Sequence, residues 1–388
     1  MNNKKLGFSA VALSCALLSS HANAAITIYE KDNMSFSTDG LVNVFYSNSS
    51  IDTTDDLGAT ADRSQSRVRM GLLPNNIGFN FSSKLSDVKV DVRSSFWVSI
   101  NDTDNNRDAS PADLGTGSLI DVRQFYATLT GDWGSILLGK DFGLFNRENI
   151  MSDQLLLGFG QTSDFFGLVD GGNVSFGNIS TGYTYTFPKA QITYRIANSN
   201  GFDFAVGVMD PNKTDGSSSE DTPRVEAELK YSAKFAENGS YKAWLSGVSQ
   251  SSELGGETQN QHGIGGGFNI SNAGLSFTAS GFESTGLGHV AGLDHIVGDD
   301  SIKSDGFLTQ LAYTLDKNRF VLTYGESTVE NTGSTLDAKH SNAGVAYFRT
   351  LYSGVTLVAE YNQTEADVTN SLIAEETRTF ALGAVVTF

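Results

Sequence analysis

The residues best placed to act on a solute lie in one long stretch, Lys140–Pro188, where acids stand among aromatic rings. The acids are Glu148, Asp153, Asp164 and Asp170. A connection longer than about 15 residues without structure of its own is usually functional or disordered, and this one is too apolar to be disordered. We therefore expect it to fold back against the inside of whatever the rest of the chain builds, and to set an opening there.

Patterns for catalysis or metal binding are weak. No serine lies in a G-x-S-x-G motif. His289 and His295 stand near Asp294, but in a polar segment without the ligand spacing of a zinc site. No calcium-loop pattern occurs either. We expect a protein that is not an enzyme and needs no metal or cofactor.

The N-terminus has the pattern of a secretory signal peptide. Lys4 and Lys5 precede a short apolar segment, and residues 22–24 form an A-x-A cleavage pattern. A transmembrane helix needs about 20 apolar residues, more than this segment offers, and a lipoprotein signal built on Cys15 fits its neighbours poorly. Removal of residues 1–24 takes away the only cysteine and lowers the net charge from −18 to −20.

The composition favours a membrane barrel for residues 25–388. There are 41 glycines, 25 phenylalanines and 13 tyrosines, yet the hydrophobic fraction is only 39%. Aromatic residues with little bulk hydrophobicity suit strands that have one face in lipid and one in water. The acidic balance argues against a nucleic-acid partner, because nucleic acids bind through cationic surfaces.

Period-two alternation is clearest from Arg224 to Phe235. One face carries Val225, Leu229 and Tyr231, and the other carries charged residues and serine. Such alternation indicates a strand with one apolar and one polar face. The same rhythm predicts a set of lipid-facing residues: Val225, Leu229, Tyr231, Phe235, Phe320, Leu322, Tyr324, Val355, Leu357, Tyr361, Phe380, Leu382 and Val386.

The connections between strands alternate in kind. Short turns are expected near residues 85, 132, 199, 238, 272, 317 and 351, and long polar loops near 55, 110, 160, 215, 256, 295, 333 and 370. The loop near 55 is expected to span residues 47–64. These fifteen connections imply about 16 strands, an even number typical of single-chain outer-membrane barrels. A soluble sandwich or propeller would need its apolar faces to meet in one core, whereas here an apolar stripe recurs on every strand.

Three local motifs resemble the general trimeric porins of Gram-negative outer membranes, the OmpF/OmpC type. The first is Ile28–Asn33 near the expected mature N-terminus. The second runs from Arg123 through Trp133 to Gly143, and the third is the terminal aromatic Phe388. The family's proline-glutamate-phenylalanine-glycine-glycine signature is absent from the long loop, and Leu41 occupies the place of a first-strand lysine.

This resemblance implies a water-filled channel in the outer membrane for passive diffusion of ions and small hydrophilic solutes. The implied third loop, residues 142–180, folds into the lumen and forms the constriction with the barrel wall. Carried onto this sequence, the wall residues are Arg67, Arg69, Arg123 and Lys140, and the loop acids are Glu148, Asp153, Asp164 and Asp170.

The resemblance also implies partners. These are two further copies in a homotrimer, lipopolysaccharide and outer-membrane lipid, and the barrel assembly machinery, which would bind Phe388. The acidic net charge predicts weak cation selectivity. The alternative is a substrate-selective channel, for example for oligosaccharides, which would need an aromatic track in the lumen. Trp244 alone falls on a polar strand face there.

Overall fold

The computed structural model describes residues 25–55, 57–102, 120–170, 175–198, 200–213, 215–289, 293–297, 300–331, 337–368 and 373–388. The expected signal peptide, residues 1–24, lies outside the described residues. The described helices are α2 (Arg147–Met151) and the short 3-10 helix η1 (Asp164–Phe166). None of the described helices is long and apolar enough to cross a membrane.

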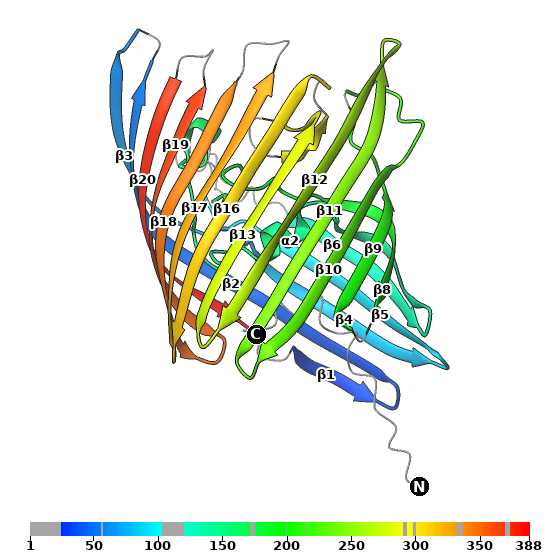
Figure 1. Ribbon diagram of the computed structural model, residues 1–388. Helices are drawn as coiled ribbons and strands as arrows, with labels where there is room; N and C mark the ends of the chain where they lie inside the picture. The colour runs from blue at the N-terminus through cyan, green and yellow to red at the C-terminus, as the bar shows by residue number, and fades with distance from the viewer. Residues whose placement is uncertain are drawn as a thin grey trace, which may run out of the picture.

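Sixteen strand positions form one closed antiparallel ring, as predicted (Figure 1). β3 and β4 share one position, because both pair with β2 and are separated only by residues 70–74. The strands of the ring are β2 (Met34–Thr54), β3 (Thr60–Arg69), β4 (Asn75–Leu85), β5 (Val88–Val98), β6 (Ile120–Gly131), β7 (Gly134–Phe142), β8 (Pro188–Ala197), β9 (Phe202–Met209), β10 (Arg224–Ala236), β11 (Gly239–Leu254), β12 (Glu257–Asn272), β13 (Leu275–Thr285), β16 (Ile302–Leu315), β17 (Asn318–Asn331), β18 (Ala338–Tyr352), β19 (Val355–Val368) and β20 (Ile373–Thr387). Outside the ring, β1 (Ile26–Lys31) pairs with the start of β2, and β14 (Leu287–His289) pairs with β15 (Leu293–Val297).

The ring closes where the last strand meets the first. β20 pairs with β2 from Leu41↔Thr387 to Thr54↔Ala374. One residue further, the Gly40 amide donates to the Phe388 carbonyl at 2.8 Å, and the Phe388 amide donates to the Gly40 carbonyl at 3.1 Å. Each of the sixteen positions is hydrogen-bonded to a neighbour on both sides, as a spanning structure in lipid requires. The segment β3, toward the long-loop rim, pairs with β2 alone.

The predicted alternation decides which side chains face outward. In β10, Val225 and Leu229 are 41% and 42% exposed, while Glu226 and Glu228 between them are buried inside the ring. Every residue of the predicted lipid-facing set lies on the outward face of its strand; Tyr231 and Val355 are half-exposed and the others are exposed. This part of the prediction is confirmed.

All seven predicted short turns connect neighbouring strands at one rim. The opposite rim differs from the prediction at residue 256, where a two-residue turn replaces the expected long loop. β11 and β12 are 16 residues each, and Gly255 and Gly256 join them with φ of 64° and 85°. Two positive φ angles suit the tight hairpin turns that match strand twist, and glycine adopts them without strain.

The expected exposed loop at residues 47–64 is also wrong. Most of it is strand, since β2 continues to Thr54 and β3 begins at Thr60, with Thr54 paired to Thr60. The residues there are polar on both faces, so the apolar stripe that marks a strand in lipid is missing. Hydrogen bonding between the two strands continues regardless of side-chain polarity.

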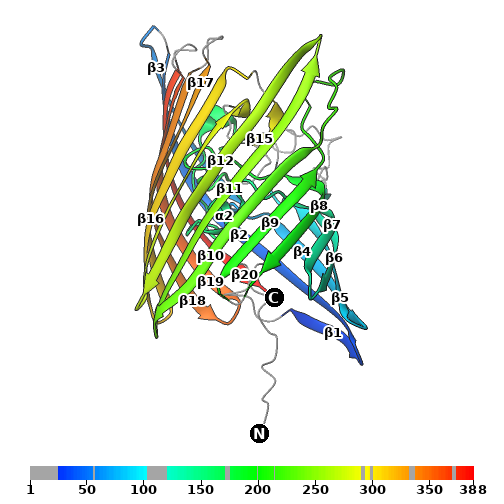
Figure 2. The ribbon, with the colours of Figure 1, turned by 45° about the vertical axis from the view of Figure 1, so that its right-hand side comes forward.

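The ring has a tall wall and a low wall. We call β11–β13 and β16–β20 the tall wall; several of its strands have 14 to 16 residues. We call β4–β9 the low wall, in which β7 has 9 residues and β9 has 8. Figure 2 shows the low wall ending well below the opposite rim. The long connection between β7 and β8 therefore starts partway down the barrel.

Leu229→Arg should impair insertion, because it places a charge on the outward face in the middle of β10. A charge on the lipid face near the bilayer midplane costs about 2–4 kcal/mol. The measurement is the fraction of protein folded into liposomes, with Glu237→Arg in the adjoining turn as the control. Equal folded fractions for Leu229→Arg and the wild type would show that this face does not meet lipid.

Candidate functional site

The connection between β7 and β8 comprises residues 143–187, and we call it the inner loop. Its described residues, 143–170 and 175–187, lie inside the barrel (Figure 1). Its apolar side chains pack against inward-facing wall residues in two clusters. Leu155 and Phe159 are fully buried in the first cluster, which includes Phe45 and Val385 of the closing strands. The second joins Tyr183 to Phe282 of β13 and Leu308 of β16. The inner loop therefore folds against the inside of the barrel, as the sequence indicated.

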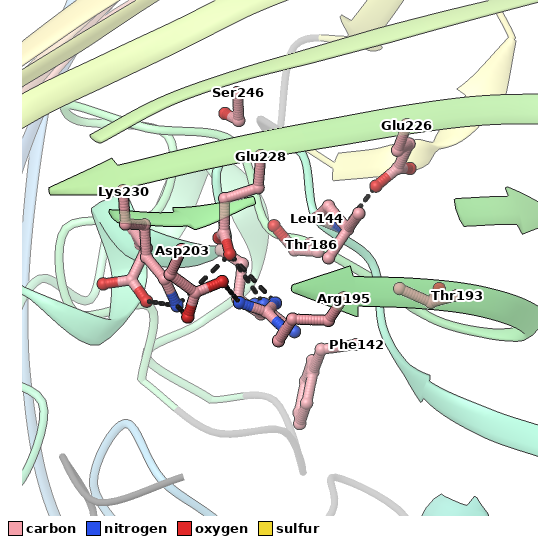
Figure 3. A network of polar contacts seen from close by, with 12 residues as sticks. Phe142, Leu144, Thr186, Thr193, Arg195, Asp203, Glu226, Glu228, Lys230 and Ser246 are labelled. Atoms are coloured by element: carbon pink, nitrogen blue, oxygen red, sulfur yellow. Dashed lines mark hydrogen bonds and ion pairs between the residues drawn. The ribbon is translucent and has the colours of Figure 1, made fainter. Parts of the chain in front are cut away.

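Three glutamates on the wall hold the backbone of the inner loop; we call them the glutamate anchors. Glu226 on β10 accepts hydrogen bonds from the amides of Leu144 and Phe145, the latter at 2.8 Å (Figure 3). Glu360 on β19 accepts from the amides of Phe159 at 2.9 Å and of Gly160.

The third anchor is Glu375 on β20, which accepts from the Asp164 amide at 2.7 Å and from the Ser163 hydroxyl at 2.9 Å. All three glutamate side chains are buried. Hydrogen bonds to an ionised carboxylate are about twice as strong as neutral ones. The anchors therefore fix the inner loop at three separate points, one on β10 and two on the tall wall. Sequence reasoning missed them, because nothing in a strand's alternation marks which inward acid meets the loop.

A network of opposite charges surrounds α2. Glu228 on β10 accepts from Arg147 of the loop at 2.8 Å and from Arg195 on β8 at 3.1 Å (Figure 3). The predicted loop acid Glu148 pairs with Lys230 at 3.2 Å and Lys242 at 2.9 Å. Burial alone would raise the pKa of Glu148, but the two ammonium groups outweigh it and hold that pKa below its usual range. Glu148 is thus a buried anion fixed against two wall lysines.

The other three predicted loop acids have different partners from those expected. Asp164 and Asp170 both pair with Arg63 on β3, the latter at 2.6 Å. Asp153 accepts from Tyr183 at 2.6 Å and from Gln310 at 2.7 Å, which makes it a buried structural carboxylate. Arg63 was absent from the sequence-based set because it lies in the stretch that we expected to be an external loop.

Two predicted wall arginines hold the inner loop through its backbone. Arg67 donates to the carbonyls of Val169 at 2.9 Å and Asp102 at 2.6 Å. Arg69 donates to the Leu168 and Val169 carbonyls, the latter at 3.1 Å, and is almost completely buried. Their charges are therefore directed at loop carbonyls and away from open water.

Arg123 lies where the inner loop returns to the low wall. Its Nε donates to Asp121 at 2.7 Å and its Nη1 donates to the Tyr185 hydroxyl at 2.9 Å. Tyr185 belongs to the inner loop, so this predicted wall residue does face the loop. It faces aromatic side chains, however, and none of the four predicted acids is among its contacts.

Lys140 lies on the outward face of β7. Its side chain is exposed and points to the same face of the strand as the exposed Leu138, two residues earlier. The residues paired with it on the neighbouring strands, Phe125 and Ala190, are also exposed. This placement corrects the expected one on the inner wall. The period-two rule applied to Ile136, Leu138 and Lys140 would have assigned the outward face from the sequence.

A further polar cluster on the low wall was not foreseen. Arg93 on β5 makes a bidentate pair with Asp39 on β2, at 2.7 Å and 3.0 Å. It also bonds to Asn80 at 2.7 Å and Gln124 at 2.9 Å. The Arg93 and Asp39 side chains are 19% and 29% exposed, so this cluster meets solvent inside the barrel.

Glu360→Ala should loosen the middle of the inner loop. It leaves the buried amides of Phe159 and Gly160 without acceptors, and each unsatisfied group costs about 1–3 kcal/mol. We expect faster proteolytic cleavage within residues 143–187 of the folded barrel. Glu365→Ala, on the exposed face of the same strand, is the control. Cleavage at the wild-type rate would mean that Glu360 does not hold the loop.

Several solved structures have a similar fold. The anion-selective porin from Comamonas acidovorans has a TM-score of 0.62 at 15% identity, with 92% of this chain and 100% of that chain covered. The outer membrane channel DcaP of Acinetobacter baumannii has a TM-score of 0.63 at 15% identity, covering 94% and 100%. Salmonella typhi OmpF, solved with daunomycin, has a TM-score of 0.55 at 16% identity, covering 94% and 100%. At such identities the likeness shows the fold. None of the curated proteins matches the chain.

The family comparison reaches further than the fold. The model of the Gram-negative porins matches residues 9–369, most of the chain. That match agrees with the closed ring of sixteen strands, the polar interior and the apolar outward face. The chain belongs to the Gram-negative porin family, and is an outer-membrane channel through which solutes diffuse.

Proposed function

We propose that the protein is a general channel for passive diffusion of ions and small hydrophilic solutes, and that its inner loop forms the constriction. This proposal rests on one observation: the glutamate anchors accept hydrogen bonds from the backbone of a long loop and fix it inside the ring. A loop fixed in this way narrows the lumen without closing strand edges, because the strands pair around the whole circumference. Porins of this fold are channels and carry out no enzymatic step.

The constriction that we propose lies between the return of the inner loop, residues 175–187, and the low wall. Its charged lining is the Arg93–Asp39 cluster and Arg123 with Asp121, all of which are partly exposed. Opposed charges across a water-filled gap orient dipolar solutes and discriminate among them by charge. In this assignment Arg67, Arg69, Glu148, Asp153, Asp164 and Asp170 position the loop, and Lys140 takes no part.

Deletion of residues 152–164 should raise single-channel conductance and admit larger sugars in liposome-swelling assays. It removes the segment bound by Glu360 and Glu375, so the loop loses two anchors and part of its bulk. Deletion of residues 215–218, in the exposed connection between β9 and β10, is the control. An unchanged size limit, in a barrel that still resists heat in detergent, would place the constriction elsewhere.

We further propose weak cation selectivity. The net charge is −18, and exposed acids such as Asp62, Glu253, Glu257 and Glu330 lie toward the long-loop rim. Exposed charge of one sign raises the local concentration of counter-ions.

Reversal potentials in a KCl gradient should therefore give a cation-to-anion permeability ratio above one in dilute salt. The ratio should approach one near 1 M, where screening limits the field to about 3 Å. A ratio below one in dilute salt would contradict the proposal and would assign selectivity to wall cations such as Arg93 and Arg123.

A homotrimer is the assembly that we propose. The solved OmpT of Vibrio cholerae includes a trimer form, and it has this fold at a TM-score of 0.54. Lys140 lies on the outward face of the low wall, and exposure of a lysine to lipid costs from about 1 kcal/mol near the interface to about 4 kcal/mol at the midplane. Protein from neighbouring copies against this wall removes that cost. We propose lipopolysaccharide and outer-membrane lipid as partners of the remaining outward face, and the assembly machinery as the partner of Phe388.

A further inference from the structure

Four aromatic rings and one arginine form a continuous group at the upper end of the low wall. The rings are Trp97 on β5, Phe142 at the end of β7, and Tyr185 and Phe187 on the inner loop. Trp97 and Phe142 have centroids 6.4 Å apart, Phe142 and Tyr185 6.3 Å, and Tyr185 and Phe187 4.8 Å, all edge to face. We call this group the aromatic cradle. Phe142, Tyr185 and Phe187 are partly exposed, so the cradle offers apolar surface inside the barrel.

The cradle holds the Arg123 guanidinium in a fixed orientation. Its central carbon lies 5.1 Å from the Trp97 ring centroid and 6.0 Å from that of Tyr185. Such stacking is a cation–π interaction. Together with the bonds from Nε to Asp121 and from Nη1 to Tyr185, it leaves Nη2 as the remaining donor group. Among the residues that the structure describes, Nη2 has no hydrogen-bond partner.

Asp121 supplies the opposite charge beside it. Its side chain is 53% exposed, against 21% for Arg123. One carboxylate oxygen accepts from Arg123 Nε at 2.7 Å, and the other has no partner within the described part of the chain. The pair therefore offers one open donor and one open acceptor next to each other, with no net charge.

We infer that this group is a binding site for zwitterionic aromatic solutes, of which free aromatic amino acids are the simplest. The solute carboxylate would bind Arg123 Nη2, its ammonium group would bind the open oxygen of Asp121, and its ring would pack on Tyr185 and Phe187. A simple anion would be attracted by Arg123 but repelled by the Asp121 carboxylate. A simple cation would be attracted by Asp121 but repelled by Arg123. A sugar could stack on the rings but would leave the ion pair without charged partners. This inference rests on the proposed function, since the solute must reach the lumen.

The test is the reduction of ion current through the purified full-length protein in a planar bilayer by four probes. Tryptophan has a ring and both charges. Tryptamine has a ring and a positive charge only, and indole-3-propionate has a ring and a negative charge only. Glycine has both charges and no ring. We expect tryptophan to reduce the current at a concentration about tenfold lower than tryptamine or indole-3-propionate, each of which loses one charged hydrogen bond. We expect glycine to be weaker than tryptophan as well, because it has no ring to pack on Tyr185 and Phe187. Equal half-maximal concentrations for all four probes would overturn the inference without any variant.

Two substitutions separate the charges. Arg123→Gln should weaken tryptophan and indole-3-propionate about tenfold and should strengthen tryptamine, because the cation that repels its ammonium group is removed. Asp121→Asn should weaken tryptophan and tryptamine and should strengthen indole-3-propionate, because the carboxylate that repels its anion is removed. The control is Arg349→Gln, a residue bonded to Asn318 at the short-turn rim, which should alter none of the four. Unchanged tryptophan binding in both cradle variants would refute the site. A wild-type protein with no KCl current would refute the channel itself, whereas a normal current without block by tryptophan refutes the cradle alone.

Discussion

Backbone hydrogen bonding in lipid is the constraint on which this structure depends. A strand that spans a bilayer cannot leave its amides and carbonyls unpaired, so the sheet must close on itself. The closure is the seam between β2 and β20, which extends through Gly40 and Phe388. Once the ring is closed, alternate side chains must face inward. These inward-facing polar side chains are then the hydrogen-bond partners of the segment that folds into the lumen.

The inner loop shows how those partners are used. A loop inside a barrel carries many backbone groups that neither water nor a ladder satisfies, and buried polar groups are costly unless they are bonded. Wall carboxylates accept from loop amides, and the wall arginines Arg67 and Arg69 donate to loop carbonyls. Wall side chains thus make the hydrogen bonds to the loop backbone that water would make to an exposed loop. These buried charged residues therefore position the inner loop.

The sequence predicted the fold because the fold depends on local rules. Alternation and turn residues gave the strand number, the outward face of β10 and the seven short turns. It predicted the inner loop because aromatic residues without period two are rare in an external loop. It did not predict the loop's partners. Contacts such as Glu360 with Phe159, or Arg63 with Asp170, depend on the three-dimensional path of the loop, which no spacing in the chain records.

Lys140 and the stretch before Arg63 show two different failures. For Lys140 a family pattern was given more weight than the local parity of Leu138, although the parity follows from backbone geometry. The strands around Thr54 and Thr60 were missed for another reason. Above the apolar band both faces of a strand meet water, so composition there no longer distinguishes a paired strand from a loop.

The reach of the inner loop has a consequence for the order of folding. Thr162 bonds to Thr379, 217 residues further along the chain, and Ser163 bonds to Glu375. Contacts between such distant segments form late, because the intervening chain must first be ordered. The middle of the loop can reach its final place only after β19 and β20 have joined the ring. A nascent chain that has not completed the barrel therefore lacks the contacts that hold the middle of the inner loop, and this part of the loop is fixed in the last stage of assembly.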